Sequence, residues 1–150
     1  MFEKILVPLD GSEHSVRASD NAVKIAKKFN GKITLIHVYS GMNPVFVSAI
    51  TRETGIPDPK FLSKLDEAAR EAGANILADG EERAKAEGVQ VETLLSAGHT
   101  VEEILKTSKE GRFDLIVIGA RGLSSIKEIF LGSVSHGVII HARCPVLVVK

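Results

Sequence analysis

This chain has little of several features that identify whole classes of protein. Cys144 is the single cysteine among 150 residues, so no disulfide can form within the chain, and a reducing cytoplasm is the expected compartment. Lys and Arg together number 19, and so do Asp and Glu. The basic excess of a protein that neutralises nucleic-acid phosphates is therefore missing. No apolar run approaches the length of a bilayer span, and the first residues, MFEKILVPLD, lack the pattern of a signal peptide. We expect a cytoplasmic protein that binds neither nucleic acid nor membrane.

Several short motifs are missing as well. The sequence contains no GxxxxGK[ST] P-loop and no GxGxxG dinucleotide fingerprint. It has five histidines but no HExxH, and His136 and His141 are five residues apart, so a helix would point them to different sides. Residues 133–137, SVSHG, match the GxSxG nucleophile elbow only in part, because Ser133 replaces the first glycine. We therefore expect neither a metal site made of protein ligands alone nor a serine hydrolase.

Short β-rich segments alternate with helical patterns along the whole chain, which is typical of an α/β fold with a parallel sheet and helices on both faces. The length and the 44% hydrophobic content predict one domain over residues 1–150. Strands are expected over residues 5–9, 32–38, 89–95, 115–118 and 146–149. Helices are expected over residues 12–29 and 60–87, from Thr100, and from about Ser133. Residues 41–59 are rich in glycine and proline, so they are expected to be irregular.

Particular residues support these elements. Ser12 is a candidate N-cap of the first helix, and Asn30 before Gly31 is a candidate end. Thr100 and Glu103 have the spacing of a capping box. The long helix carries an apolar side made of Leu62, Leu65, Ala69, Ala72 and Ile76. The segments LIVI (115–118) and VLVV (146–149) are apolar at every position, as expected of strands buried on both faces.

The most unusual segment is residues 119–135, GARGLSSIKEIFLGSVS. It follows a predicted strand, and its second part, Gly132 with Ser133, begins a predicted helix. In open α/β sheets ligands bind beyond the carboxyl ends of the strands, and a helix N-terminus favours an anion. Asp10-Gly11-Ser12 follows the first strand and forms a second candidate loop. Composition alone leaves another interpretation open, since tight turns and helix ends also use glycine.

The spacing of that segment supports a resemblance. GARG, nine further residues and GS resemble the G-x2-G-x9-G-[ST] signature of the universal stress protein family, in its nucleotide-binding branch. The opening ILVPLDGS and the closing CPVLVVK are also similar to the first and last strands of that family. The resemblance covers essentially the whole chain. It implies a single-domain, open, parallel sheet of five strands in the order 3-2-1-4-5, Rossmann-like and similar to the adenine nucleotide α-hydrolases.

The same resemblance implies a site for ATP, ADP or AMP, with Mg²⁺ or Mn²⁺ held mainly by the phosphates and with Asp10 as a candidate partner. The residues expected to approach the ribose and phosphates are Gly119, Arg121 and Gly122. Those expected around the phosphate tail are Gly132, Ser133, Val134 and Ser135. The nucleoside side is expected to be lined by Pro8, Leu9 and Asp10. Val38 would offer backbone groups to the adenine, and further wall residues would be Ile118, Ala97 and Gly98.

The function implied is that of a cytoplasmic ATP-binding stress protein, which acts as a nucleotide-dependent sensor or switch. One alternative is a slow ATP hydrolase or another enzyme that transforms adenine nucleotides, in which Asp10 would orient water. A second alternative is a dimeric interaction module that does not use a nucleotide. In the implied strand order, Val146–Val149 lies at the sheet edge, where its free backbone groups would pair with a second copy to give a homodimer.

Overall fold

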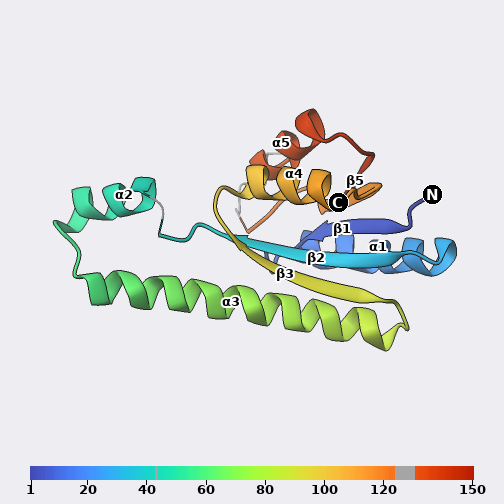
Figure 1. The fold of residues 1–150 in the computed structure, drawn as a ribbon, viewed down its shortest axis with the longest axis horizontal. Coiled ribbons are helices and arrows are strands. Elements are labelled where there is room, and N and C mark those ends of the chain that lie inside the picture. Colours follow the sequence, from blue (N-terminus) through green and yellow to red (C-terminus); the bar gives the residue numbers. More distant parts are fainter. Residues whose placement is uncertain (43, 124–130) are drawn as a thin grey trace.

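The computed structural model describes residues 1–42, 44–123 and 131–150. Strands and helices alternate along the chain from the first element to the last (Figure 1). The strands are β1 (Lys4–Pro8), β2 (Lys32–Tyr39), β3 (Val91–Ala97), β4 (Leu115–Gly119) and β5 (Val146–Val149). The helices are α1 (Glu13–Phe29), α2 (Pro44–Thr54), α3 (Pro59–Ala86), α4 (Thr100–Glu110) and α5 (Ser133–His141). Within this described part of the chain, no helix is both long and apolar enough to cross a membrane.

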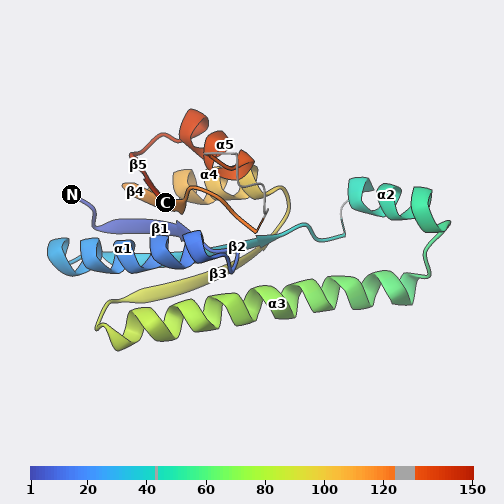
Figure 2. The same ribbon diagram turned by 180° about the vertical axis from the view of Figure 1, so that it is seen from behind.

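The strands form one parallel sheet in the order β3-β2-β1-β4-β5. This confirms the predicted fold class and strand order. Helices α1 and α3 cover one face of the sheet, and α4 and α5 cover the other (Figures 1 and 2). Because the first crossover takes the chain to β2 and a later one returns it to β4, strand order reverses beside β1. The loop that follows β1 and the loop that follows its neighbour β4 therefore lie on opposite sides of one crevice.

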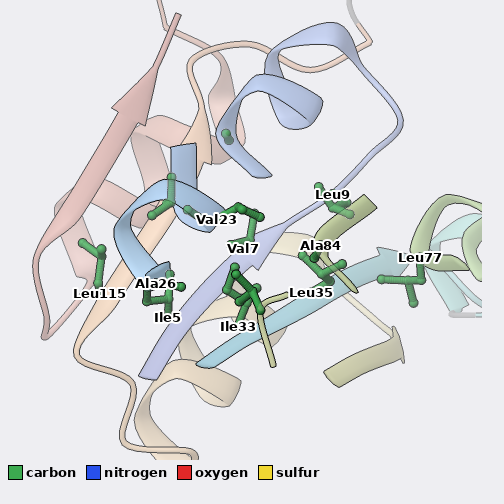
Figure 3. Packing of buried hydrophobic residues seen from close by; sticks show 14 residues of the cluster. Ile5, Val7, Leu9, Val23, Ala26, Ile33, Leu35, Leu77, Ala84 and Leu115 are labelled. Atoms are coloured by element: carbon green, nitrogen blue, oxygen red, sulfur yellow. The ribbon is translucent and has the colours of Figure 1, made fainter. Parts of the chain in front are cut away.

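The core consists of two apolar layers, one on each side of the sheet. Successive side chains of a strand point to opposite faces, so Ile5 and Val7 join the layer beneath α1 and α3 while Leu6 joins the layer beneath α4 and α5. Figure 3 shows the first layer, in which strand residues such as Ile5 and Ile33 belong to one cluster with Ala26 of α1. All five residues of β4 are buried, as the LIVI segment predicts.

The predicted ends of α1 are confirmed. The Ser12 side chain accepts a hydrogen bond from the Ser15 backbone N–H at 3.2 Å, which satisfies one of the free donors of the first turn. At the other end Asn30 adopts the left-handed conformation with φ of 54°. The cap at Ser12 also fixes where the chain turns after β1, directly beside the crevice.

Three local predictions are wrong. Residues 41–59 are not irregular throughout, because α2 occupies Pro44–Thr54 and Asn43 lies outside the described residues. The capping box is absent: His99, not Thr100, is the N-cap of α4, and the Glu103 carboxylate accepts a hydrogen bond from Ser96 Oγ at 2.7 Å instead. The third strand begins at Val91, two positions later than expected.

Helix α3 is longer than the sheet that it covers. Its buried residues lie in its second half and are Gly73, Leu77, Gly80 and Ala84. Its first half continues past the sheet toward α2, which stands apart from the sheet in both views (Figures 1 and 2). The compact part of the molecule is therefore the sheet with α1, α4, α5 and the second half of α3.

Candidate functional site

A pocket of about 310 Å³ lies at the carboxyl ends of β1, β2 and β4 and at the starts of α4 and α5. It occupies the crevice where the strand order reverses, the usual ligand position in an open α/β sheet. Twelve of the residues that the sequence predicts for the site line this pocket, namely Pro8, Leu9, Asp10, Val38, Ile118, Gly119, Arg121, Gly122, Gly132, Ser133, Val134 and Ser135. Ala97 and Gly98 are not part of its lining.

The pocket has an apolar side and a polar side. The apolar side chains come from β2, β4 and α4 and are Ile36, Val38, Ile118 and Ile104. The polar groups come from the loop after β1, the loop after β4 and the start of α5, and they include Asp10, Arg121 and Ser133. A small molecule with one flat apolar end and one charged end fits this division.

The start of α5 forms the anion-binding end of the pocket. Gly132 is its N-cap, with extended backbone and no side-chain hydrogen bond to the first turn. The first N–H groups of any α-helix have no acceptor within the helix, and the dipole makes that end positive. Ser133, the first helical residue, is exposed at the pocket, so its hydroxyl adds a further donor.

The loop after β4 is joined to α5 through the peptide of Ala120. The Ala120 carbonyl accepts hydrogen bonds from Gly132 N at 2.7 Å and from Ser135 Oγ at 2.8 Å. The Ala120 N–H donates to the Val149 carbonyl at 2.7 Å, which ties the same residue to β5. Ser135, which the resemblance places around the phosphate tail, lines the pocket, and its hydroxyl contacts protein carbonyls. Residues 124–130 of the segment between the glycines lie outside the described residues.

Asp10 and Gly122 meet across the crevice. Asp10 Oδ1 accepts a hydrogen bond from the Ser12 N–H at 2.9 Å. A Cβ atom added to Gly122 would lie 2.5 Å from Asp10 Oδ2, and Gly122 does not have a positive φ. The missing side chain at Gly122 thus makes room for the Asp10 carboxylate of the protein itself.

Comparison with known proteins identifies the family of this chain. The model of the universal stress protein family matches residues 1–150. This chain belongs to the universal stress protein family. The universal stress protein YxiE of Bacillus subtilis (strain 168) is 40% identical over 151 aligned residues, which cover 100% of both chains.

Solved members of the universal stress protein family share the fold. The universal stress protein UspA from Lactobacillus plantarum has a TM-score of 0.83 at 26% identity, over 99% of this chain and 98% of that one. A universal stress protein solved in complex with cAMP has a TM-score of 0.69 at 28% identity, over 99% of this chain and 97% of that one.

Five residues that line the pocket of this universal stress protein are not among the site residues predicted from the sequence: Ser15, Ile36, Thr100, Ile104 and Leu123. One of them, Ile36, had a usable signal. Ile36 lies two positions before Val38, and residues two apart in a strand share a face. Thr100 and Ile104 are four apart in a helix and so also share a face, but no signal in the sequence placed α4 over the pocket.

His37 supports the site from the opposite face of the sheet. Its Nδ1 donates a hydrogen bond to the Leu9 carbonyl at 2.7 Å, where β1 ends and the crevice begins. The sequence suggests only metal binding as a role for the histidines, so this contact of His37 is not predicted. Among the residues that the structure describes, no group of three His, Cys, Asp or Glu side chains is arranged to hold a metal ion.

Proposed function

We propose that this universal stress protein binds an adenine nucleotide, with ATP as the physiological ligand, and acts as a nucleotide-dependent sensor or switch in the stress response. The observation that carries the proposal is that residues from widely separated parts of the chain line one pocket, with apolar side chains at one side and the start of α5 at the other. The relative solved with cAMP supports the adenine class of ligand.

The two sides of the pocket suggest how the ligand lies. The base would occupy the apolar side near Val38, Ile104 and Ile118. The phosphates would lie at the start of α5, where free N–H groups, the Ser133 hydroxyl and the helix dipole favour negative charge. Residues 119–122 would pass beside the ribose and phosphates, with Arg121 adding positive charge.

A divalent cation fits the same end of the pocket. Asp10 places a carboxylate beside a site that otherwise favours anions, and a carboxylate next to phosphates is a common pair of ligands for Mg²⁺. Mg²⁺ or Mn²⁺ would be held mainly by the phosphates, with Asp10 as the protein partner. The positive charge of the cation would offset the repulsion between the negative Asp10 carboxylate and the negative phosphates.

The Asp10 carboxylate also favours a second candidate function, slow hydrolysis of ATP. A carboxylate in the pocket can orient a water molecule toward a phosphate. Sustained release of phosphate by purified protein, lost on Asp10→Asn, would support the enzyme. Nucleotide that stays bound without turnover would support the switch.

We also propose a homodimer formed through β5 and a cytoplasmic location. β5 lies at the edge of the sheet, and Leu147 on it is 39% exposed. An apolar edge strand with unpaired backbone groups needs cover, which a second copy related by a two-fold axis supplies. The single cysteine fits a reducing compartment.

The test of nucleotide binding has two parts. Freshly purified protein is denatured, and the released small molecules are identified by mass spectrometry. The melting temperature is then measured with ATP, ADP, AMP, cAMP and GTP, each with magnesium. ATP at a hundred times its dissociation constant should add about 2.7 kcal/mol of stability, or roughly 5–10 °C for a domain of this size. If no adenine nucleotide is released and none at millimolar concentration shifts the melting temperature, the chain is an interaction module without a nucleotide.

A further inference from the structure

The side chain of Ser135 is buried against the protein, although the resemblance places it around the phosphate tail, two positions after the end of the signature at Ser133. It is 2% exposed, and its Oγ lies 2.8 Å from the Ala120 carbonyl oxygen and 3.0 Å from that of Gly132. The Gly132 carbonyl already accepts the His136 N–H within the helix at 2.9 Å. The Ala120 carbonyl likewise accepts one backbone N–H, that of Gly132 at 2.7 Å. The shorter of the two distances from Ser135 Oγ therefore assigns its single hydroxyl hydrogen to Ala120, whose carbonyl lies outside the helix.

Ala120 is held through both of its backbone polar groups. Its carbonyl oxygen has two lone pairs and receives two donors, Gly132 N–H and Ser135 Oγ. Its N–H donates to the Val149 carbonyl. These bonds join the loop after β4 to the first turn of α5, two segments that are adjacent in space but separated by more than ten positions in sequence.

We propose that Ser135 is a positioning residue for the nucleotide site. It holds the first turn of α5 against residues 119–122, so that the free N–H groups of the helix and the glycine loop converge on one ligand. Its hydroxyl does this through Ala120 and does not touch the phosphates. This inference rests on the proposed nucleotide-binding function and names the device that shapes that site.

Ser133 provides a matched comparison in the same helical turn. Both serines line the pocket, but Ser133 is exposed, whereas the Ser135 side chain is buried. Each loses one hydroxyl on substitution by alanine. A residue that contacts the ligand directly changes binding without changing the free protein, whereas a positioning residue changes both.

The experiment measures two quantities for the wild type, Ser133→Ala and Ser135→Ala. One is the dissociation constant of ATP with magnesium, and the other is amide hydrogen exchange at Gly132 in the protein without nucleotide. We expect Ser135→Ala to weaken ATP binding about tenfold, the effect of one hydrogen bond, and to speed exchange at Gly132. Ser133→Ala should weaken binding and leave that exchange unchanged.

Other outcomes overturn the inference in distinct ways. Weaker binding by Ser135→Ala with unchanged exchange at Gly132 would mean that the hydroxyl contacts the ligand. A lower melting temperature with unchanged affinity would mean that Ser135 only stabilises the fold. A wild type that binds no nucleotide would refute the proposed function and this role with it. If Ser135→Ala does not fold, Ser135→Cys, which keeps a weak donor, is measured in the same way; a smaller change in both quantities is then expected, and no change in either contradicts the role.

Discussion

Gly122 illustrates how a residue of a binding signature can be required by the protein before any ligand is present. Its place is fixed by Asp10, whose Oδ2 lies 2.5 Å from where a Cβ would be. The Asp10 carboxylate is in turn held by the Ser12 N–H. A side chain at Gly122 must therefore displace a carboxylate that the loop after β1 keeps in position. Close approach of a phosphate is a second, independent reason for the same glycine.

A double-mutant cycle separates these reasons. Gly122→Ala should destabilise the protein without nucleotide by about 1 kcal/mol, or roughly 2–4 °C in melting temperature, because Asp10 has to move. In an Asp10→Ala background the same change should cost much less, since residues in contact have non-additive effects. Thermal unfolding of the four proteins measures the coupling.

Leu123→Ala is a suitable control for that cycle, because Leu123 is 74% exposed and adjacent in sequence. It should leave the melting temperature nearly unchanged in both backgrounds. If the costs of Gly122→Ala and Asp10→Ala simply add, the two residues are not coupled and Gly122 is needed for another reason.

The sequence identified which residues gather at the site but not what each of them contacts. Gly122 belongs to the family signature, and the resemblance places Ser135, two positions after the signature ends, around the phosphate tail. Their partners, Asp10 and Ala120, are distant in sequence, and the contacts arise only when β1, β4 and α5 are assembled. The local sequence pattern does not indicate which distant residue a side chain will contact. The hydrogen bond between Ser135 and Ala120 therefore could not be predicted.

At the scale of elements, α3 packs on the sheet through glycine. A Cβ on Gly73 would lie 2.5 Å from His37 Cδ2 and 2.8 Å from Leu95 Cδ1. The His37 ring cannot move freely, because its Nδ1 donates to the Leu9 carbonyl. The apolar pattern of the sequence predicts that a neighbouring side of α3 faces the sheet. Glycine has no apolar side chain and adds nothing to that pattern, although it allows the closest approach of the helix to the strands.

Gly73→Ala should therefore destabilise the protein by about 1–3 kcal/mol through overpacking. Helix propensity alone predicts the opposite, a gain of about 1 kcal/mol. Ala72→Gly is the matched change at the exposed neighbouring position, and propensity should dominate there, with a loss of about 1 kcal/mol. Urea unfolding of both variants measures the two costs, and a more stable Gly73→Ala protein would contradict the close packing of α3 on β2.

The wrong prediction for residues 41–59 has a single cause. The proline and glycine content of residues 41–59 predicts an irregular segment, but these residues stand at the ends of helices. Pro44 begins α2 and Pro59 begins α3, and Gly55, with φ of 84°, follows the end of α2. Proline suits the first turn of a helix, and glycine suits the position just after its end. The strongly periodic elements, α1 and the buried strands, were located from sequence to within a residue or two, because their pattern and their caps agree.

At the scale of the whole molecule, β5 has one paired side and one free side. Ile116 N donates to the Pro145 carbonyl, and Ala120 N donates to the Val149 carbonyl. Since alternate residues of a strand direct their backbone groups to opposite edges, the N–H and C=O groups of Val146 and Val148 point away from β4. These are the groups that a second copy would pair with.

Light scattering at micromolar concentration should accordingly report about twice 16.1 kDa. Val148→Pro removes a donor from the free edge without removing a bond to β4, so it should shift the protein toward monomer. Val148→Ala keeps the donor while shortening the side chain, and should remain dimeric. A wild type that stays monomeric, or a proline variant that dimerises like the wild type, would refute pairing through β5.

The central position of β1 has a consequence for synthesis of the chain. β1 ends at Pro8 and β4 begins at Leu115, so one neighbour of the innermost strand leaves the ribosome long after the strand itself. At about 5–20 residues per second that interval lasts roughly 5–20 s. During this interval the edge of β1 that later pairs with β4 is open to other chains. Leu6 also lacks the apolar residues of α4 and α5 that cover it in the complete fold. The nascent chain is therefore most in need of a chaperone while its first strand is complete and its fourth is still being translated.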